Sequence, residues 1–522
     1  MSNSHSSRVL SMAGGTLASR ATGFARVLVL AWVLGFTPIA DAFNLANTVP
    51  NMLFDLVLGG IASATFIPVF VERIALDGER KAWRSISSVI TGSVVVLFVA
   101  SVAAWFLAPW IVDGFTVLNH PAGTIHVENL SQQRSLATAL LRWFVPQIFF
   151  YGIIGIATAL LNIRKRFGVA TWVPVANNII CIGVLFWFHL VDPTPSLNTL
   201  TSSHYLVWLG LGTTAGVAVQ FLCLLPSLAR SDLWRLRFRL DLRDPAVKSV
   251  GRLGSWTLLV VLANQVSLYV VIAFAFALGG NGPVSAYTYG WTFMQMPYAV
   301  VVVSVLGALT PQLAAHATDK EFDLLSYKLQ TGLRQSLVII IPCTIILLVL
   351  SQPIVSVLLE HMNASHHWLV GSVLAVLAAG LPGFTVFQLA VRGLQAMQRA
   401  RDVFILYVIQ NGLTVGLCVV IGKHTMSGLV ASISIAYTVA AFLALAVLAR
   451  YKVSIGAALW SKYVGRSLAA SLISGVVMAV VYAVPSATHG IGLLYRLLMA
   501  VIFGALSFGS VVILQTRNTS NV

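Results

Sequence analysis

Long apolar runs, separated by short charged or polar clusters, make up most of this chain. A helix needs about 20 apolar residues to cross the hydrocarbon core of a bilayer, and division at the clusters gives about fourteen such runs. They cover approximately residues 8–35, 41–72, 85–112, 135–162, 170–190, 204–229, 252–279, 283–315, 330–359, 367–397, 402–422, 426–449, 464–484 and 490–515. The pattern predicts an all-α, polytopic membrane protein.

The second run carries a polar stripe. Its members recur every three or four positions and therefore share one helix face. They are Asp41, Asn44, Thr48, Asn51 and Asp55. Two interpretations stay open, because polar residues at this spacing often only join helices together. Charge within a membrane segment more often marks a functional cavity, which we favour here, with Asp41 and Asp55 as its lining or gating charges.

The eighth run repeats this stripe 244 positions later, with Ser285, Thr288, Thr292 and Gln295. About six segments fit within this offset, so both halves keep the same orientation and form parallel repeats about an axis along the membrane normal. Because the polar face recurs at the same place in both halves, we expect a hydrated cavity between two lobes.

The repeat predicts four regions along the chain. Residues 1–229 form an N-terminal lobe of six helices, and 230–251 form a cytoplasmic amphipathic linker. Residues 252–450 form a C-terminal lobe of six helices, and 451–522 form a final helix pair outside the repeat.

The charge distribution sets the orientation. Only 9% of residues are charged, against roughly a quarter in soluble proteins, and the net charge is +16. The basic residues concentrate in the even-numbered loops, a pattern that indicates topology and not nucleic-acid binding. Both termini and the even loops are therefore expected to be cytoplasmic.

The sequence offers little enzymatic or metal chemistry. Four cysteines lie within apolar runs without a CxxC pair, so we expect neither disulfides nor a metal site. No GxxxxGK[ST] motif is present, and the external carboxylates are scattered over several loops. A membrane glycosyltransferase would need grouped carboxylates, so we expect no catalytic residues and a transporter, not an enzyme.

The first run contains two arginines, Arg20 and Arg26. An unpaired guanidinium in hydrocarbon costs about 2.5 to 3.5 kcal/mol on insertion scales. Arg20 and Asp55 are expected at similar depth on adjacent antiparallel helices, where they pair in the cavity or form a fixed bridge that sets helix registry. Arg26, about 9 Å further out, has no obvious partner. Two arginines beside small side chains suit a multivalent oxyanion such as a phosphate.

The stretch "SRATGFARVLVLAWVLG", followed by "ADAFNLANTVPNMLFDLVLGGIASATFIPVFVE", resembles the MurJ/MviN family of lipid II flippases in the MOP superfamily, in its actinobacterial form. The resemblance covers the whole chain and is most specific in the first two helices. It implies fourteen helices, two six-helix lobes and a final helix pair that forms a groove for the lipid tail. Arg20, Arg26, Asp41, Pro50 and Asn51 match positions that the family uses around its central cavity.

This chain departs from better-known family members at two cavity arginines, where it has Phe54 and Thr292. The resemblance therefore leaves open how the diphosphate is held. The residues that could supply further donors are Asn47, Asn51, Asn264, Gln265 and Thr292.

The resemblance implies export of lipid II, the undecaprenyl-diphosphate-linked peptidoglycan precursor, to the outer leaflet of the bacterial cell membrane by alternating access. An inside-negative membrane potential favours outward movement of an anion by about 2.3 kcal/mol per charge per 100 mV. We therefore expect no cofactor, and the coupling ion is left open. Expected partners are lipid II, membrane lipids and the cell-wall synthesis machinery, without nucleic acid. The alternatives are flipping of another polyprenyl-linked oligosaccharide, drug export, and a structural role in recruiting wall-synthesis proteins.

Overall fold

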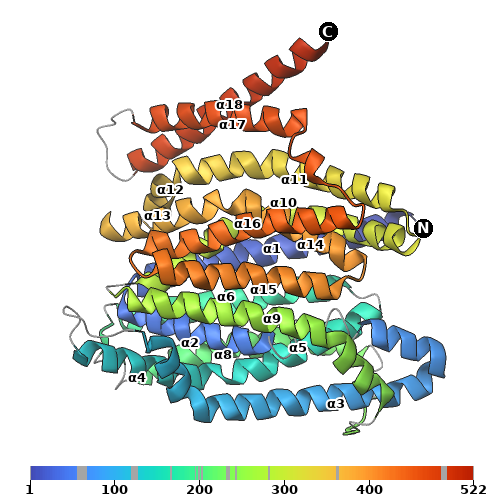
Figure 1. Ribbon diagram of the computed structural model, residues 1–522. Coiled ribbons are helices and arrows are strands. Elements are labelled where there is room, and N and C mark those ends of the chain that lie inside the picture. The colour runs from blue at the N-terminus through green and yellow to red at the C-terminus, as the bar shows by residue number, and fades with distance from the viewer. Residues whose placement is uncertain are drawn as a thin grey trace. The chain divides into compact units, whose positions relative to one another are not determined.

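The structure is a computed structural model of the 522-residue chain, shown in Figure 1. It describes all residues except 1, 56–66, 119–126, 165–166, 194, 198–199, 201–203, 231–235, 242–243, 280–281, 360–363, 484–490 and 521–522. Within this described part the regular elements are all helices. The chain divides into two compact units, Met1–Ser285 and Ala286–Val522.

The helices of each unit lie side by side along one direction (Figure 1). Those of the first unit are α1 (Ser2–Leu34), α2 (Pro38–Phe54), α3 (Ile67–Thr116), α4 (Val127–Phe144), α5 (Pro146–Ile163), α6 (Phe167–Val191), α8 (His204–Ala229) and α9 (Pro245–Ala277). Helix α10 (Pro283–Thr318) begins in the first unit and continues into the second. The remaining helices are α11 (Phe322–Val349), α12 (Ser351–Leu358), α13 (Ala364–Ala379), α14 (Leu381–Ala396), α15 (Ala400–Leu417) with the π-helical turn Cys418–Gly422, α16 (Met426–Arg450), α17 (Lys462–Ala483) and α18 (Ile491–Ser520).

The predicted membrane class is confirmed. Among the described residues, 11 helical stretches are long and apolar enough to span a bilayer, and the bent pair α13 and α14 makes a twelfth. Each of these spans coincides with one of the predicted segments. The two other predicted segments, 41–72 and 490–515, both include residues outside the described part.

Proline and glycine positions shape these spans. Gly78, with φ of 69°, lies in the left-handed region that glycine adopts without strain, and it turns the chain inside α3 before the long span 81–116.

Pro146 is the first residue of α5 and separates this helix from α4. Helices α13 and α14 meet at Gly380 with a bend of 45°.

Helix neighbours in the first unit differ from one sequence-based expectation. Helix α1 packs along α6, and it makes few contacts with α2. The prediction that the first two segments lie together along their length was therefore wrong. Helix α2 packs instead against α4, while α6 continues the layer to α8. Small residues allow close approach here, as at Gly152, where an added Cβ would lie 2.2 Å from a methyl carbon of Leu97.

Helix α9 packs along α3 and belongs to the first compact unit. The compact units therefore divide the chain at Ser285, later than the lobe boundary expected at residue 252. A compact unit is defined by static contacts, whereas a lobe is a body that moves. The boundaries of the lobes, the linker and the final helix pair stay predictions.

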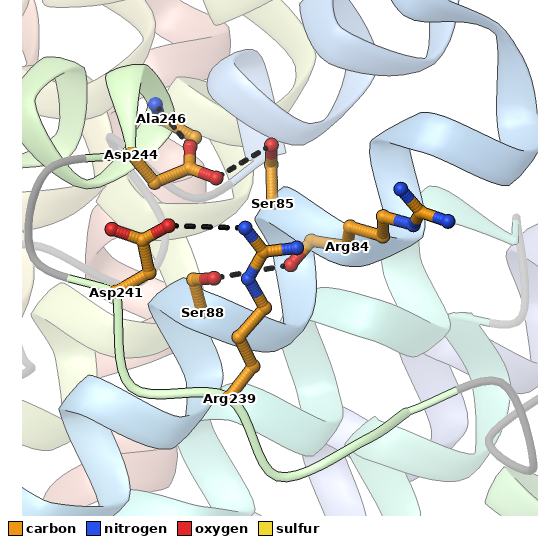
Figure 2. A network of polar contacts seen from close by, with 7 residues as sticks. All are labelled: Arg84, Ser85, Ser88, Arg239, Asp241, Asp244 and Ala246. Atoms are coloured by element: carbon orange, nitrogen blue, oxygen red, sulfur yellow. Dashed lines mark hydrogen bonds and ion pairs between the residues drawn. The ribbon is translucent and has the colours of Figure 1, made fainter.

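Within the predicted linker, residues 236–241 run as an extended strap along α3 (Figure 2). The backbone N–H of Arg237 donates to Ser87 Oγ at 3.2 Å, and that of Arg239 donates to Thr91 Oγ1 at 3.2 Å. Alternate strap residues thus meet hydroxyls spaced one helical turn apart on α3. Phe238, between them, is 83% exposed.

Asp244 joins this strap to the start of α9. Its Oδ1 accepts the backbone N–H of Ala246 at 2.8 Å, which caps α9, and its Oδ2 accepts the Ser85 hydroxyl at 3.0 Å (Figure 2). Asp244 is buried, whereas Asp241 forms an exposed ion pair with Arg239 at 3.0 Å. One carboxylate therefore ties two helices together, and the other lies at the surface.

We expect Asp244→Ala to destabilise the protein by about 1 to 3 kcal/mol, because a helix cap and a buried side-chain hydrogen bond are lost together. Thermal unfolding of the purified protein in detergent measures this change. Asp241→Ala is the matched control and should cost at most about 1 kcal/mol, as exposed ion pairs contribute little. Equal losses in the two variants would contradict the role of Asp244.

Candidate functional site

The two arginines of α1 lie on different faces of that helix. Six residues at about 100° each separate their directions by about 120°. Arg20 is exposed, whereas Arg26 is half-buried. The Arg26 guanidinium interacts with the Cys181 thiol of α6 and lies close enough to the Tyr151 hydroxyl of α5 for an electrostatic contact. Arg26 therefore has neutral polar partners within the first unit.

Asn178 of α6 fixes the rotation of α1. Its Nδ2 donates to the backbone carbonyl of Ser19 at 3.2 Å and to the Thr22 hydroxyl oxygen at 3.0 Å. This contact holds the face with Ser19, Thr22 and Arg26 toward α6, and it directs Arg20 away from α6. Among the described residues, no hydrogen bond or ion pair holds the Arg20 guanidinium.

Asp55 does not pair with Arg20 within the described part of the chain. Its Oδ2 instead accepts a hydrogen bond from Gln265 Nε2 of α9 at 3.4 Å. The Gln265 Oε1 atom is buried and has no hydrogen-bond partner among the described atoms. The expected Arg20–Asp55 bridge was wrong, because α1 packs against α6 and does not run beside α2.

Asp41 has a different environment from the rest of the polar stripe. Its side chain is 2% exposed, and Oδ1 accepts both the backbone N–H of Ser285 at 2.8 Å and the Ser285 hydroxyl at 2.6 Å. Asn44 Nδ2 donates to the same Ser285 oxygen at 3.0 Å. A carboxylate at the first turn of α10 also meets the positive end of the helix dipole. Asp41 therefore anchors the start of α10.

This anchor joins two positions that the internal repeat makes equivalent. Asp41 and Ser285 are separated by 244 residues, the offset of the repeat. Two residues that the sequence offset aligns are therefore in direct contact, whereas the repeat and its axis stay predictions.

The other predicted site residues form local hydrogen bonds or lie half-buried. Asn51 Nδ2 donates to the Asn47 carbonyl at 2.8 Å, and both side chains are half-buried. Asn264 is half-buried on α9, one residue before Gln265. Thr292 belongs to the second unit, where its hydroxyl donates to the Thr288 carbonyl at 2.8 Å. The central cavity that would gather these residues stays a prediction.

The sequence analysis missed the polar partners of Arg26. Cys181 is one of the four cysteines that predict neither a disulfide nor a metal site, and the sequence pattern did not single out Tyr151 or the amide pair Asn177 and Asn178. A signal was present, because two adjacent asparagines are unusual within an apolar membrane run. Their helical position relative to Arg26 could not be known without the packing of α1 on α6.

The second unit contains an apolar cavity of about 540 Å³ between α10, α11 and α17. Its lining residues are Val305, Arg334, Gln335, Val338, Ile339 and Tyr463. The Arg334 guanidinium lies 5.1 Å from the centre of the Tyr463 ring, a cation–π contact. An apolar wall with one cation at its edge suits a lipid chain that ends in an anionic group. Within the part of the chain that the structure describes, no three His, Cys, Asp or Glu side chains are grouped so that they could hold a metal ion.

Sequence comparison finds relatives over most of the chain. The family model described as "Lipid II flippase MurJ" matches residues 30–507. The lipid II flippase MurJ of Burkholderia cenocepacia is 29% identical over 401 residues, which cover 75% of this chain and 73% of that protein. The probable lipid II flippase MurJ of Rhizobium tropici is 26% identical over 406 residues, covering 76% of this chain and 71% of the relative.

Structural comparison finds the same architecture. A structure titled "Lipid II flippase MurJ, inward closed conformation" matches with a TM-score of 0.77 at 21% identity, covering 97% of this chain and 99% of the other. An inward-facing multidrug resistance MATE family transporter of the MOP superfamily matches with a TM-score of 0.66 at 15% identity, over 86% of this chain and 99% of that one. At these identities the similarity shows a shared fold.

The environments of the two α1 arginines predict different accessibility to water. In a background with the exposed Cys223 replaced by serine, we expect Arg20→Cys to react roughly tenfold faster than Arg26→Cys with a water-soluble methanethiosulfonate reagent. Mass spectrometry of the intact protein measures both rates. Equal rates, or an unreactive position 20, would show that Arg20 does not face water.

Proposed function

The chain belongs to the MurJ family of lipid II flippases, and we propose that its own arginines guide the diphosphate of lipid II across the membrane. The match of the family model across residues 30–507 carries the family assignment. The protein is accordingly a multi-pass membrane transporter and not an enzyme. Its substrate is the lipid-linked precursor of peptidoglycan.

We place the protein in the bacterial cytoplasmic membrane with both termini in the cytoplasm. The support is the concentration of basic residues in the even-numbered loops, such as Lys81 and Arg84 at one end of the long span of α3. In this orientation α1 runs outward, and Asp41 and Ser285 lie toward the outer leaflet. The headgroup of lipid II would enter from the opposite, cytoplasmic side.

Arg20 is the first binding group in this proposal. It is exposed, and the described residues provide it with no carboxylate. A guanidinium that faces the pathway without a counter-ion gains paired, charge-assisted hydrogen bonds when phosphate oxygens arrive. Arg26 raises the positive potential nearby, and its neutral partners Cys181 and Tyr151 leave its charge uncompensated. The amides and hydroxyl proposed from the sequence add donors: Asn47, Asn51, Asn264, Gln265 and Thr292.

Asp41 and Ser285 act as an outer closure in this mechanism. The two hydrogen bonds to Asp41, together with the one from Asn44, hold α2 against the start of α10. Each hydrogen bond contributes about 0.5 to 1.5 kcal/mol net, and somewhat more to a charged group. A closure of this strength is firm at rest, and the binding energy of a substrate can release it.

The lipid tail would stay in the apolar phase while the headgroup crosses. The cavity between α10, α11 and α17 offers an apolar surface for such a chain, with Arg334 at its edge. We propose that the tail lies along α17 and α18 and that the membrane potential drives the headgroup outward. Moving one negative charge outward releases about 2.3 kcal/mol of free energy per 100 mV of membrane potential, so ATP hydrolysis is not needed.

Recruitment of cell-wall synthesis proteins remains a second proposal for the same protein. Drug export is less favoured, because the exposed arginine would repel the cationic drugs that an exporter must accept. Similarity to a multidrug transporter at 15% identity concerns the fold alone.

Complementation tests this function in cells. We expect the wild-type chain to restore growth of cells depleted of their lipid II flippase, and not of cells that lack a flippase for another polyprenyl-linked saccharide. Arg20→Ala and Arg26→Ala should abolish rescue at normal membrane levels, because the phosphate loses its charged partners. Arg401→Ala, at an exposed position outside the proposed site, is the matched control. Full rescue by well-inserted arginine variants would contradict the mechanism.

A further inference from the structure

A cavity lined by several polar side chains lies between the C-terminal part of α3 and helix α4, and none of its lining residues belongs to the transport site. It has a volume of about 440 Å³, within the range of small-molecule pockets. We propose that it binds the phosphoethanolamine headgroup of an outer-leaflet phospholipid, with the phosphate at Arg134 and Arg142 and the amine at Asp113. This inference goes beyond lipid II transport and does not depend on it.

Helix α4 presents a continuous polar face to this cavity. Ser131, Ser135, Thr138 and Arg142 follow one another at intervals of three or four residues, and all of them line the cavity. The opposite face of α4 is fully buried, with Leu136, Leu140, Leu141 and Phe144 at 0% exposure. The helix thus has an apolar side that fixes it in the unit and a polar side that lines the cavity.

Arg134 is fixed by one hydrogen bond to the backbone, and not all of its N–H groups are used in hydrogen bonds. Its Nη2 atom donates to the Thr116 carbonyl at the end of α3 at 3.0 Å. Its Nε atom is buried and has no hydrogen-bond partner among the described atoms. The Arg134 side chain also lines the cavity, so its positive charge can attract an oxyanion there.

Arg142 provides the second cation. Its guanidinium lies 5.3 Å from the centre of the Trp105 ring, and its side chain is exposed. Positions 134 and 142 are about 12 Å apart along the helix, and both side chains reach the wall of one cavity. A phosphate between the two guanidinium groups would receive charge-assisted hydrogen bonds from both sides.

Asp113 decides which phosphate-bearing headgroup fits. Its carboxylate is exposed on the same cavity, where it would repel a purely anionic ligand. A headgroup that carries an ammonium beside its phosphate satisfies the carboxylate and both arginines together. Phosphoethanolamine has this arrangement of charges, and glycerol phosphate does not.

The surroundings place the cavity at the level of lipid headgroups. Trp105 and Trp110 of α3 are 45% and 68% exposed, and tryptophan concentrates at membrane interfaces. The span of α3 carries no charge between Arg84 and Asp113, so Asp113 marks the outer end of its hydrocarbon segment. An outer-leaflet lipid can therefore reach the cavity with its tails still in the bilayer.

Lipid binding to the purified full-length protein in detergent tests the proposal. Dihexanoyl-phosphatidylethanolamine should raise the unfolding temperature in a saturable manner, which gives an affinity. Arg134→Gln and Arg142→Gln should each weaken this affinity by roughly tenfold or more, since a charge-assisted hydrogen bond is lost. Asp113→Asn should weaken binding of phosphatidylethanolamine and strengthen binding of phosphatidylglycerol. Arg401→Gln is the matched control and should leave the affinity unchanged.

Arg142→Gln is the decisive variant, because Arg142 donates no hydrogen bond to the protein in the described part, and its loss should not disturb folding. Unchanged affinity in this variant would overturn the proposal. Equal stabilisation by dihexanoylglycerol, which lacks a phosphate, would overturn it as well. Equal affinity for free phosphoethanolamine or inorganic phosphate would overturn the assignment to a lipid. None of these outcomes depends on whether the protein transports lipid II.

Discussion

Every polar group that this chain carries into the membrane needs a partner within the protein, because the hydrocarbon offers none. The described helices meet this constraint locally where they can. Hydroxyls such as Thr22 and Thr48 donate to the carbonyl four residues earlier in their own helix. Amides reach across helices, as Asn178 does to α1 and Asn44 does to α10. The few groups left without a partner are therefore the informative ones.

The carboxylates and arginines differ in whether the protein provides them with a partner. Asp41 is buried and accepts two hydrogen bonds from Ser285, so it serves to hold helices together in this state. Arg26 interacts with the neutral Cys181 thiol and Tyr151 hydroxyl, which do not neutralise the positive charge of its guanidinium. Arg20 is exposed, and no carboxylate in the described part neutralises it. This combination of a hydrogen-bonded buried carboxylate and an exposed cation is the basis of the mechanism proposed above.

The sequence predicted most of the fold because the signals for it are local. A run of apolar residues indicates a membrane span without reference to any other part of the chain, so the predicted segments other than 41–72 and 490–515 coincide with observed spans. The repeat was also visible, because an offset of 244 residues aligns Asp41 with Ser285 before any contact is known. The structure adds a direct contact between those two residues, and the repeat of the lobes stays a prediction.

The errors arose where helix neighbours had to be guessed. Consecutive segments were assumed to be adjacent, but α1 packs on α6, so Asp55 meets Gln265 and not Arg20. The divergence of Arg20 and Arg26 follows from the helical period, yet only the contact with Asn178 shows which face points inward. The extended course of residues 236–241 depends on hydroxyls of α3 that are far away in sequence.

The central claim is that Arg20 is left open for the phosphates of the substrate. The affinity of the purified protein for lipid II, and for undecaprenol, which has the same tail and no phosphate, tests this most directly in wild type and Arg20→Gln. The account predicts that Arg20→Gln weakens binding of lipid II by roughly tenfold or more and leaves binding of undecaprenol unchanged. Equal affinities of the two proteins for lipid II, or a parallel loss for both lipids, would contradict it.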